Sequence, residues 1–140
     1  MSEGGTRRTA STWALTACGV WLVGLGLYLA ALRPPLLPED ARFMGTTAAR
    51  LHDAAPGIER WLRLVFRVMG GFMAGTGVLT LFVAAQPPSR GRAWVTGLAG
   101  LATVGVMSAV NFTLDSDFRT LLLVPVLAWM GAFVLQRAGR

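Results

Sequence analysis

The sequence predicts an all-α membrane protein, a four-transmembrane-helix bundle of up-down-up-down order with one longer outer loop. Two observations predict this fold class. Four apolar runs, each about as long as a membrane crossing, divide the chain. Charged residues make up only 14% of it and the mean hydropathy is +0.54, whereas about a quarter of a soluble domain is charged. We therefore expect residues 1–140 to form a single integral domain in a lipid bilayer.

The first span is expected over residues 13–32. This run carries no charge and, at about 1.5 Å per residue, matches a hydrocarbon layer of about 30 Å. Residues 1–11 are polar and are expected to be disordered. Arg7 and Arg8 precede the run, so a signal peptide is the alternative interpretation. We favour a retained helix, because the run exceeds the roughly 7–15 apolar residues of such peptides and no small-x-small cleavage site follows.

The later spans follow from the same criterion, and they are expected over residues 61–85, 93–114 and 118–136. They are continuous apolar runs rather than alternating ones, which argues against the strands of a β-barrel. Asp117 is placed to cap the last helix, and Pro125 is expected to kink it.

The outer loop is expected over residues 33–57, because Pro34 and Pro35 end the first helix. Within the loop a short helix is predicted from Ala48 to Asp53, with Thr46 or Thr47 as its cap.

Both termini are expected in the cytoplasm, with the outer loop on the other side of a bacterial cytoplasmic membrane. Counts of arginine on the two sides, six against seven, do not decide the orientation. The density of arginine beside the span ends favours a cytoplasmic location of the termini. The arginines on this side are Arg7, Arg8, Arg90, Arg92, Arg137 and Arg140. A bacterial source is inferred from the absence of lysine in a chain rich in alanine, glycine and leucine.

Several kinds of site are excluded by residue counts. The chain has one cysteine, Cys18, and one histidine, His52, too few for a disulfide framework, a Cys/His zinc site or haem held by two histidines. No basic run with interleaved aromatics is present, so nucleic acid is not an expected partner. We assign no catalytic residue, metal or cofactor.

A cluster of polar residues is expected near the outer ends of spans two to four, formed by Arg63, Arg67, Asn111, Asp115, Asp117 and Arg119. Arg67 and Asn111 each lie about one turn inside the hydrocarbon, where an unpaired charge is costly. We interpret the cluster as structural, with Arg67 snorkelling outward and pairing with Asp115 or Asp117. The alternative is a half-buried pocket for an anionic headgroup, a quinone or a small substrate. Proton or ion transfer is a third, less favoured interpretation.

Gly71 and Gly75 form a small-xxx-small pattern on span two. Close helix packing inside the monomer is the favoured interpretation, and an interface with a partner or a second copy of the chain is the alternative. Trp13, Trp61 and Trp94 suit the interfacial belts of a membrane protein.

Three short segments carry a resemblance, and they are residues 38–45, 67–71 and 115–119. With its four-span layout, the chain resembles small uncharacterised four-helix integral membrane proteins of bacteria, loosely DoxX-like in architecture. DoxX-like proteins include subunits associated with quinone-linked oxidoreductases, so the resemblance implies an accessory role beside a redox complex. It transfers no functional residue.

Three functions are consistent with these patterns. A non-enzymatic accessory or scaffold subunit of a membrane complex is favoured, because smooth Gly/Ala faces occur without a catalytic constellation. The alternative is a binder or carrier of a lipid, a quinone or another small amphipathic molecule. An enzyme or a transporter in its own right is the third.

Overall fold

The computed structural model describes residues 3–87 and 89–138, and the side chains of residues 10–87, 89 and 91–137. Every regular element within them is a helix, which confirms the all-α prediction. The elements are α1 (Glu3–Ala31), α2 (Pro38–Phe43), α3 (Ala48–Ala54), α4 (Ile58–Ala85), α5 (Arg90–Gly100), the π-helix η1 (Leu101–Gly105), α6 (Val106–Thr113) and α7 (Leu123–Ala138).

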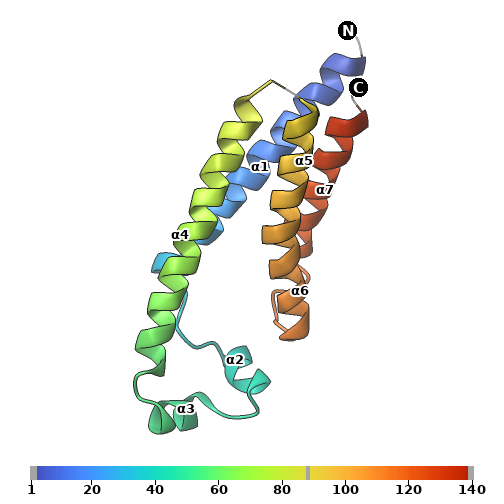
Figure 1. Cartoon of the computed structure of the whole chain (residues 1–140). Coiled ribbons are helices and arrows are strands. Elements are labelled where there is room, and N and C mark those ends of the chain that lie inside the picture. Colours follow the sequence, from blue (N-terminus) through green and yellow to red (C-terminus); the bar gives the residue numbers. More distant parts are fainter. Residues whose placement is uncertain (1–2, 88, 139–140) are drawn as a thin grey trace.

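The long helices form two antiparallel hairpins, α1 with α4 and the continuous α5–η1–α6 helix with α7 (Figure 1). Both chain ends lie at one end of the molecule, here called the terminal end. The segments α2 and α3 lie at the opposite end, here called the loop end (Figure 1). The short helix α3 confirms the sequence prediction, and its cap is Thr47, whose side chain accepts a hydrogen bond from the Arg50 backbone nitrogen.

Among the described residues, three helices are long and apolar enough to cross a membrane: Ala10–Ala31, Ile58–Ala85 and Gly91–Thr113. This finding indicates an integral membrane protein. The expectation of a disordered N-terminus is wrong from Glu3 onward, because α1 already begins there. A helix continues through a polar segment when the following turns are fixed by packing, since extension costs far less than nucleation. Four side chains used to predict the orientation, those of Arg7, Arg8, Arg90 and Arg140, lie outside the described residues.

The last helix begins later than predicted, at Leu123 instead of Phe118, and α7 has 16 residues. Residues 117–122 form turns, so Asp117 does not cap the helix. Pro125 explains the start. It lies in the first turn of α7, where its missing N–H has no intrahelical partner to lose, so the proline begins the helix instead of kinking it.

The α1–α4 hairpin is held by close approach of the two backbones at glycines. A Cβ added at Gly26 would lie 2.5 Å from the Ala74 nitrogen, and one at Gly77 would lie 2.7 Å from the Val23 nitrogen. A Cβ at Gly70 would collide with the Gly26 carbonyl oxygen. In lipid, where apolar contact alone gives little drive for association, such close approach is the source of favourable packing.

The predicted packing of Gly71 and Gly75 inside the monomer is therefore wrong. Neither glycine has a heavy atom within 4 Å of its added Cβ, and both are exposed. Successive residues of an α-helix are rotated by about 100°, so Gly71 points in a different direction from Gly70, which contacts α1. The two glycines lie on the side of α4 that faces away from α1.

Helix α1 also carries the core that joins the two hairpins. Cys18 and Leu22 of α1 pack with Val104 of η1 and Trp129 of α7 in one buried cluster. A second cluster, nearer the terminal end, contains Leu15, Ala84 and Ala132 from α1, α4 and α7. Helix α1 therefore lies between α4 and α7.

Trp129 determines how α7 packs against α5. Its indole Nε1 donates a hydrogen bond to the Thr96 carbonyl at 2.6 Å. Trp129 can reach that backbone because Gly100 has no side chain, and a Cβ there would collide with the indole. The π-helix η1 begins one residue later, with the Val106 N–H bonded to the Leu101 carbonyl. A single π turn of this kind is an insertion in an α-helix.

Polar groups inside the long helices are mostly satisfied locally. Threonine hydroxyls donate to the carbonyl four residues earlier at Thr16, Thr76, Thr80, Thr96, Thr103 and Thr113. This bonding hides the hydroxyl from lipid. Gln136 is the contrast, because it is buried and neither its amide oxygen nor its amide nitrogen has a hydrogen-bond partner among the described residues.

The turn between α4 and α5 is held by Arg92. Its buried guanidinium donates to the carbonyl of Gln86 and, at 3.5 Å, to that of Val83. These carbonyls belong to the C-terminal end of α4, where a cation complements both the open acceptors and the helix dipole. The Ser89 hydroxyl caps α5 by accepting from the Arg92 backbone nitrogen at 3.1 Å.

Substitution of the buried glycines tests this packing. Gly70→Ala and Gly77→Ala should each lower the stability by about 1–3 kcal/mol, because the added methyl overpacks a backbone contact. Gly71→Ala and Gly75→Ala are matched controls, and they should be neutral or stabilising by up to about 1 kcal/mol through helix propensity. Unfolding of the purified protein in detergent measures both pairs. Equal losses in all four variants would show that the two faces of α4 are packed alike.

Candidate functional site: the polar junction at the loop end

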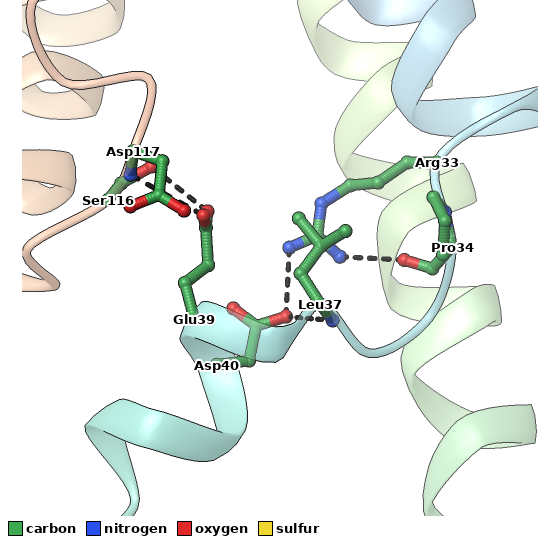
Figure 2. Close-up of polar contacts among 7 residues, drawn as sticks. All are labelled: Arg33, Pro34, Leu37, Glu39, Asp40, Ser116 and Asp117. Atoms are coloured by element: carbon green, nitrogen blue, oxygen red, sulfur yellow. Dashed lines mark hydrogen bonds and ion pairs between the residues drawn. The ribbon is translucent and has the colours of Figure 1, made fainter.

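The polar junction consists of Arg33, Glu39, Asp40, Arg42, Ser116 and Asp117, and Figure 2 draws all of these residues except Arg42. It is organised by the six-residue helix α2. Pro38 begins α2 because its fixed φ suits the first helical position. Asp40, in the first turn, accepts the Leu37 N–H at 2.9 Å, so its carboxylate both caps the helix and complements the helix dipole.

Two tight helix ends shape the segments that meet at the junction. Helix α2 is terminated by Gly45, two residues after Phe43, and its φ of +66° places it in the left-handed region. The hydrogen bonds Gly45 N–Arg42 O and Thr46 N–Ala41 O complete a Schellman motif. Helix α6 is terminated in the same way by Asp115, a non-glycine residue with a φ of 51°.

The end of α6 has the same pair of hydrogen bonds. The Asp115 N–H bonds to the Phe112 carbonyl, and the Ser116 N–H bonds to that of Asn111. The chain therefore reverses sharply after α6, and Ser116 and Asp117 follow directly. Ser116 is buried, whereas Asp117 is exposed.

Glu39 joins α2 to this reversal. The Ser116 hydroxyl donates to Glu39 Oε1 at 2.9 Å, and the Asp117 backbone N–H lies 3.4 Å from Glu39 Oε2 (Figure 2). Arg42 adds an ion pair with Asp117 at 3.2 Å, but both side chains are exposed. Since exposed ion pairs contribute only about 0–1 kcal/mol, the contact of Glu39 with buried Ser116 is the stronger connection.

Arg33 joins α2 to the first hairpin. Its guanidinium donates to Asp40 at 3.2 Å and to the Pro34 carbonyl at 3.0 Å (Figure 2). It also lies 3.8 Å from the centroid of the Phe66 ring of α4. Only 12% of the Arg33 side chain is exposed, so this cation is desolvated and satisfied by a carboxylate, a carbonyl and an aromatic face.

The predicted pairing of Arg67 with Asp115 or Asp117 is wrong. Asp115 pairs with Arg119, and Asp117 pairs with Arg42. Arg67 is exposed, and no ion pair involves it among the described side chains.

The other predicted cluster residues are also separated. Arg63 is exposed on α4, and Asn111 is half-buried on α6, where it donates to the Met107 carbonyl of its own helix at 2.9 Å. The depth argument assumed that spans two and three are neighbours. In the structure α4 and α5–η1–α6 are not extensively packed, because α1 lies between α4 and the second hairpin.

Sequence reasoning missed Arg33, Arg42 and Ser116 as members of the junction. A local signal existed for Asp40, an acidic residue two positions after a proline that begins a helix. No local pattern indicates that Glu39 meets Ser116, because that contact joins residues 77 positions apart.

The chemistry of the junction is that of a structural connection. Its charged groups point at one another, and each carboxylate already accepts from a donor of the chain. Among the described residues, no group of three or more His, Cys, Asp or Glu side chains could hold a metal ion. His52 Nδ1 lies 3.4 Å from Glu59 Oε1 on the exposed surface between α3 and α4.

No protein-family model, no curated protein and no solved structure matches this chain. The geometry of the described residues is therefore the basis for the functional argument.

A double-variant cycle tests the junction. Glu39→Gln and Ser116→Ala should each increase amide hydrogen exchange in residues 38–45 and 114–122, by about tenfold for a bond to a charged acceptor. The double variant should lose little more than either single variant, because the two groups act on one bond. Arg42→Gln is the control at the exposed pair and should change exchange less than about fivefold. Additive losses would exclude the coupling.

Proposed function

We propose that the protein is a non-enzymatic subunit of a membrane complex and that one face of α4 binds a transmembrane helix of a partner. One observation carries the proposal. Arg67, Gly71 and Gly75 follow at intervals of four residues, so they share a face. Arg67 is exposed and has no ion pair among the described side chains, and within the same part of the chain both glycines face open space.

The position of Arg67 makes exposure to lipid unfavourable. It lies six residues beyond Trp61, about 9 Å further along α4, and Trp61 suits the membrane interface. A charged side chain at membrane depth costs at least about 2.5 kcal/mol near the centre of a span unless it snorkels or pairs. A partner helix with a carboxylate at this level would satisfy the guanidinium.

The two glycines supply the other half of such an interface. Small residues allow a second backbone to approach closely, which is how helices associate in lipid. The α1–α4 contact of this chain uses the same device at Gly26 and Gly70. The face containing Gly71 and Gly75 is the equivalent surface, and no helix of the described residues lies on it.

A carrier function for a quinone or lipid at the loop end has less support, because the polar groups there are bonded to one another. The proposed subunit role agrees with the accessory role implied by the loose DoxX-like resemblance.

We also propose that α7 completes a fourth crossing in a bacterial cytoplasmic membrane, with both termini in the cytoplasm. Its 16 residues extend about 24 Å, and the turns of residues 118–122, which include Phe118, Leu121 and Leu122, precede it. The density of arginine at the terminal end supports the orientation.

Isolation from native membranes tests the subunit proposal. The tagged wild-type chain, extracted in a mild detergent, should retain a stoichiometric partner protein. Arg67→Leu and Gly71→Leu should each reduce the retained partner at least about tenfold, since loss of a desolvated charge pair or of close packing costs more than ~1.4 kcal/mol. The melting temperature of the purified chain should not fall.

Gly24→Leu is the matched control. Gly24 is a helical glycine of α1 whose added Cβ also meets open space, so this variant changes another lipid-facing surface equally. Partner loss with Gly24→Leu, or no partner with the wild type, would contradict the proposal. Concentration-dependent self-association abolished by Gly71→Leu would identify the partner as a second copy.

Reporter fusions test the topology. A fusion after Arg140 should report a cytoplasmic location, and one within residues 46–55 should report a periplasmic location. A periplasmic signal from the first fusion together with a cytoplasmic signal from the second would invert the orientation, and the same location for both fusions would reduce the number of crossings to three.

A further inference from the structure

A second surface, independent of the proposed partner face, lies between α5–η1 and α7. It is a groove of about 310 Å³, within the range of roughly 300–1,000 Å³ that small-molecule ligands occupy. Its walls are almost wholly apolar and include Trp94, Leu101, Val104, Met130 and Phe133. The groove lies along the membrane-crossing part of the second hairpin.

The groove exists because of the local sequence of α5 and η1. Gly97 and Gly100 line the groove and have no side chains. The space that a Cβ would take is occupied by the Phe133 ring at Gly97 and by the Trp129 ring at Gly100, both from α7. The π turn of η1 supplies three further lining residues, Leu101, Val104 and Gly105. Leu101 and Met130 are largely exposed at its edges, so the groove opens to the surrounding lipid.

The guanidinium of Arg137 lies at the terminal end of this groove. The Arg137 guanidinium lies 4.9 Å from the centroid of the Trp94 ring and 5.6 Å from that of Phe133, two rings that line the walls. Arg137 is exposed, and among the described side chains no carboxylate pairs with it. Its cation–π contacts hold the guanidinium over the rings without neutralising its charge.

We propose that the groove binds one anionic phospholipid, with an acyl chain along the apolar walls and the headgroup phosphate on Arg137. The apolar walls match a hydrocarbon chain. A guanidinium offers phosphate two parallel N–H donors, and a net negative headgroup adds attraction at the membrane surface. The Trp94 indole, beside Arg137, has the amphipathic character of the headgroup level.

Native mass spectrometry of the purified full chain tests the site. Phosphatidylglycerol and phosphatidylcholine with the same acyl chains are titrated separately. One phosphatidylglycerol molecule should be retained, with higher affinity than phosphatidylcholine. Arg137→Gln should lower the affinity for phosphatidylglycerol about fivefold and that for phosphatidylcholine by less, because phosphatidylcholine shares the phosphate but not the net negative charge. Leu101→Phe, which puts bulk into the groove, should weaken both lipids.

Two matched variants separate the groove from the general surface. Arg63→Gln removes another exposed arginine near a span end, and Leu79→Phe enlarges an exposed residue of α4, and neither should alter lipid retention. Thermal melting of all four variants should match the wild type, because the altered side chains are exposed. Equal retention of the two lipids, equal effects of Arg63→Gln and Arg137→Gln, or dimers that Leu101→Phe dissociates would each overturn the proposal.

Discussion

The backbones of α1 and α4 approach each other so closely at Gly26–Gly70 and Gly19–Gly77 that no side chain fits between them. Lipid does not drive apolar helices together, so a helical hairpin in a membrane gains stability from dispersion at short range, and dispersion falls off within a fraction of an ångström. This contact determines which side of α1 and which side of α4 are buried against each other. An adjacent side of α1, with Leu15, Cys18 and Leu22, packs on α7 and η1, and the opposite side of α4 is left outside the fold.

The second hairpin is held by a different device. Trp129 uses the space above Gly100 to place its indole N–H on the Thr96 carbonyl, which combines a large buried ring with a hydrogen bond that lipid cannot replace. The hairpins meet in the core around Leu22 and are joined again at the loop end, where Glu39 bonds to Ser116. A local helix, α2, thus connects chain segments that are distant in sequence.

Sequence reasoning predicted the features that depend on composition and length. It was wrong about features that depend on which helices pack against one another. The long apolar runs gave the helices, and Thr47 capped α3 as its residue type suggests. The choice between Gly70 and Gly71 as the packing residue is a choice between faces about 100° apart, which only the position of α1 decides. The partners assigned to Arg67 failed for the same reason, because equal depth in the membrane does not make two helices neighbours. A proline in a helical run can either kink the helix interior or lie in the first turn. Because residues 117–122 form turns and α7 begins at Leu123, Pro125 lies in the first turn.

The arginines divide into those that complete the fold and those that face outward. Arg33 and Arg92 turn inward, the first to Asp40 and the second to the carbonyls at the end of α4, so neither is available to another molecule. Arg67 and Arg137 turn outward at opposite ends of the molecule and on different hairpins. Because α1 stands between α4 and α7, a helix docked beside Arg67 would not cover the groove beside Arg137. The proposed protein partner and the proposed phospholipid would therefore occupy different surfaces of the chain, one beside Arg67 and the other beside Arg137.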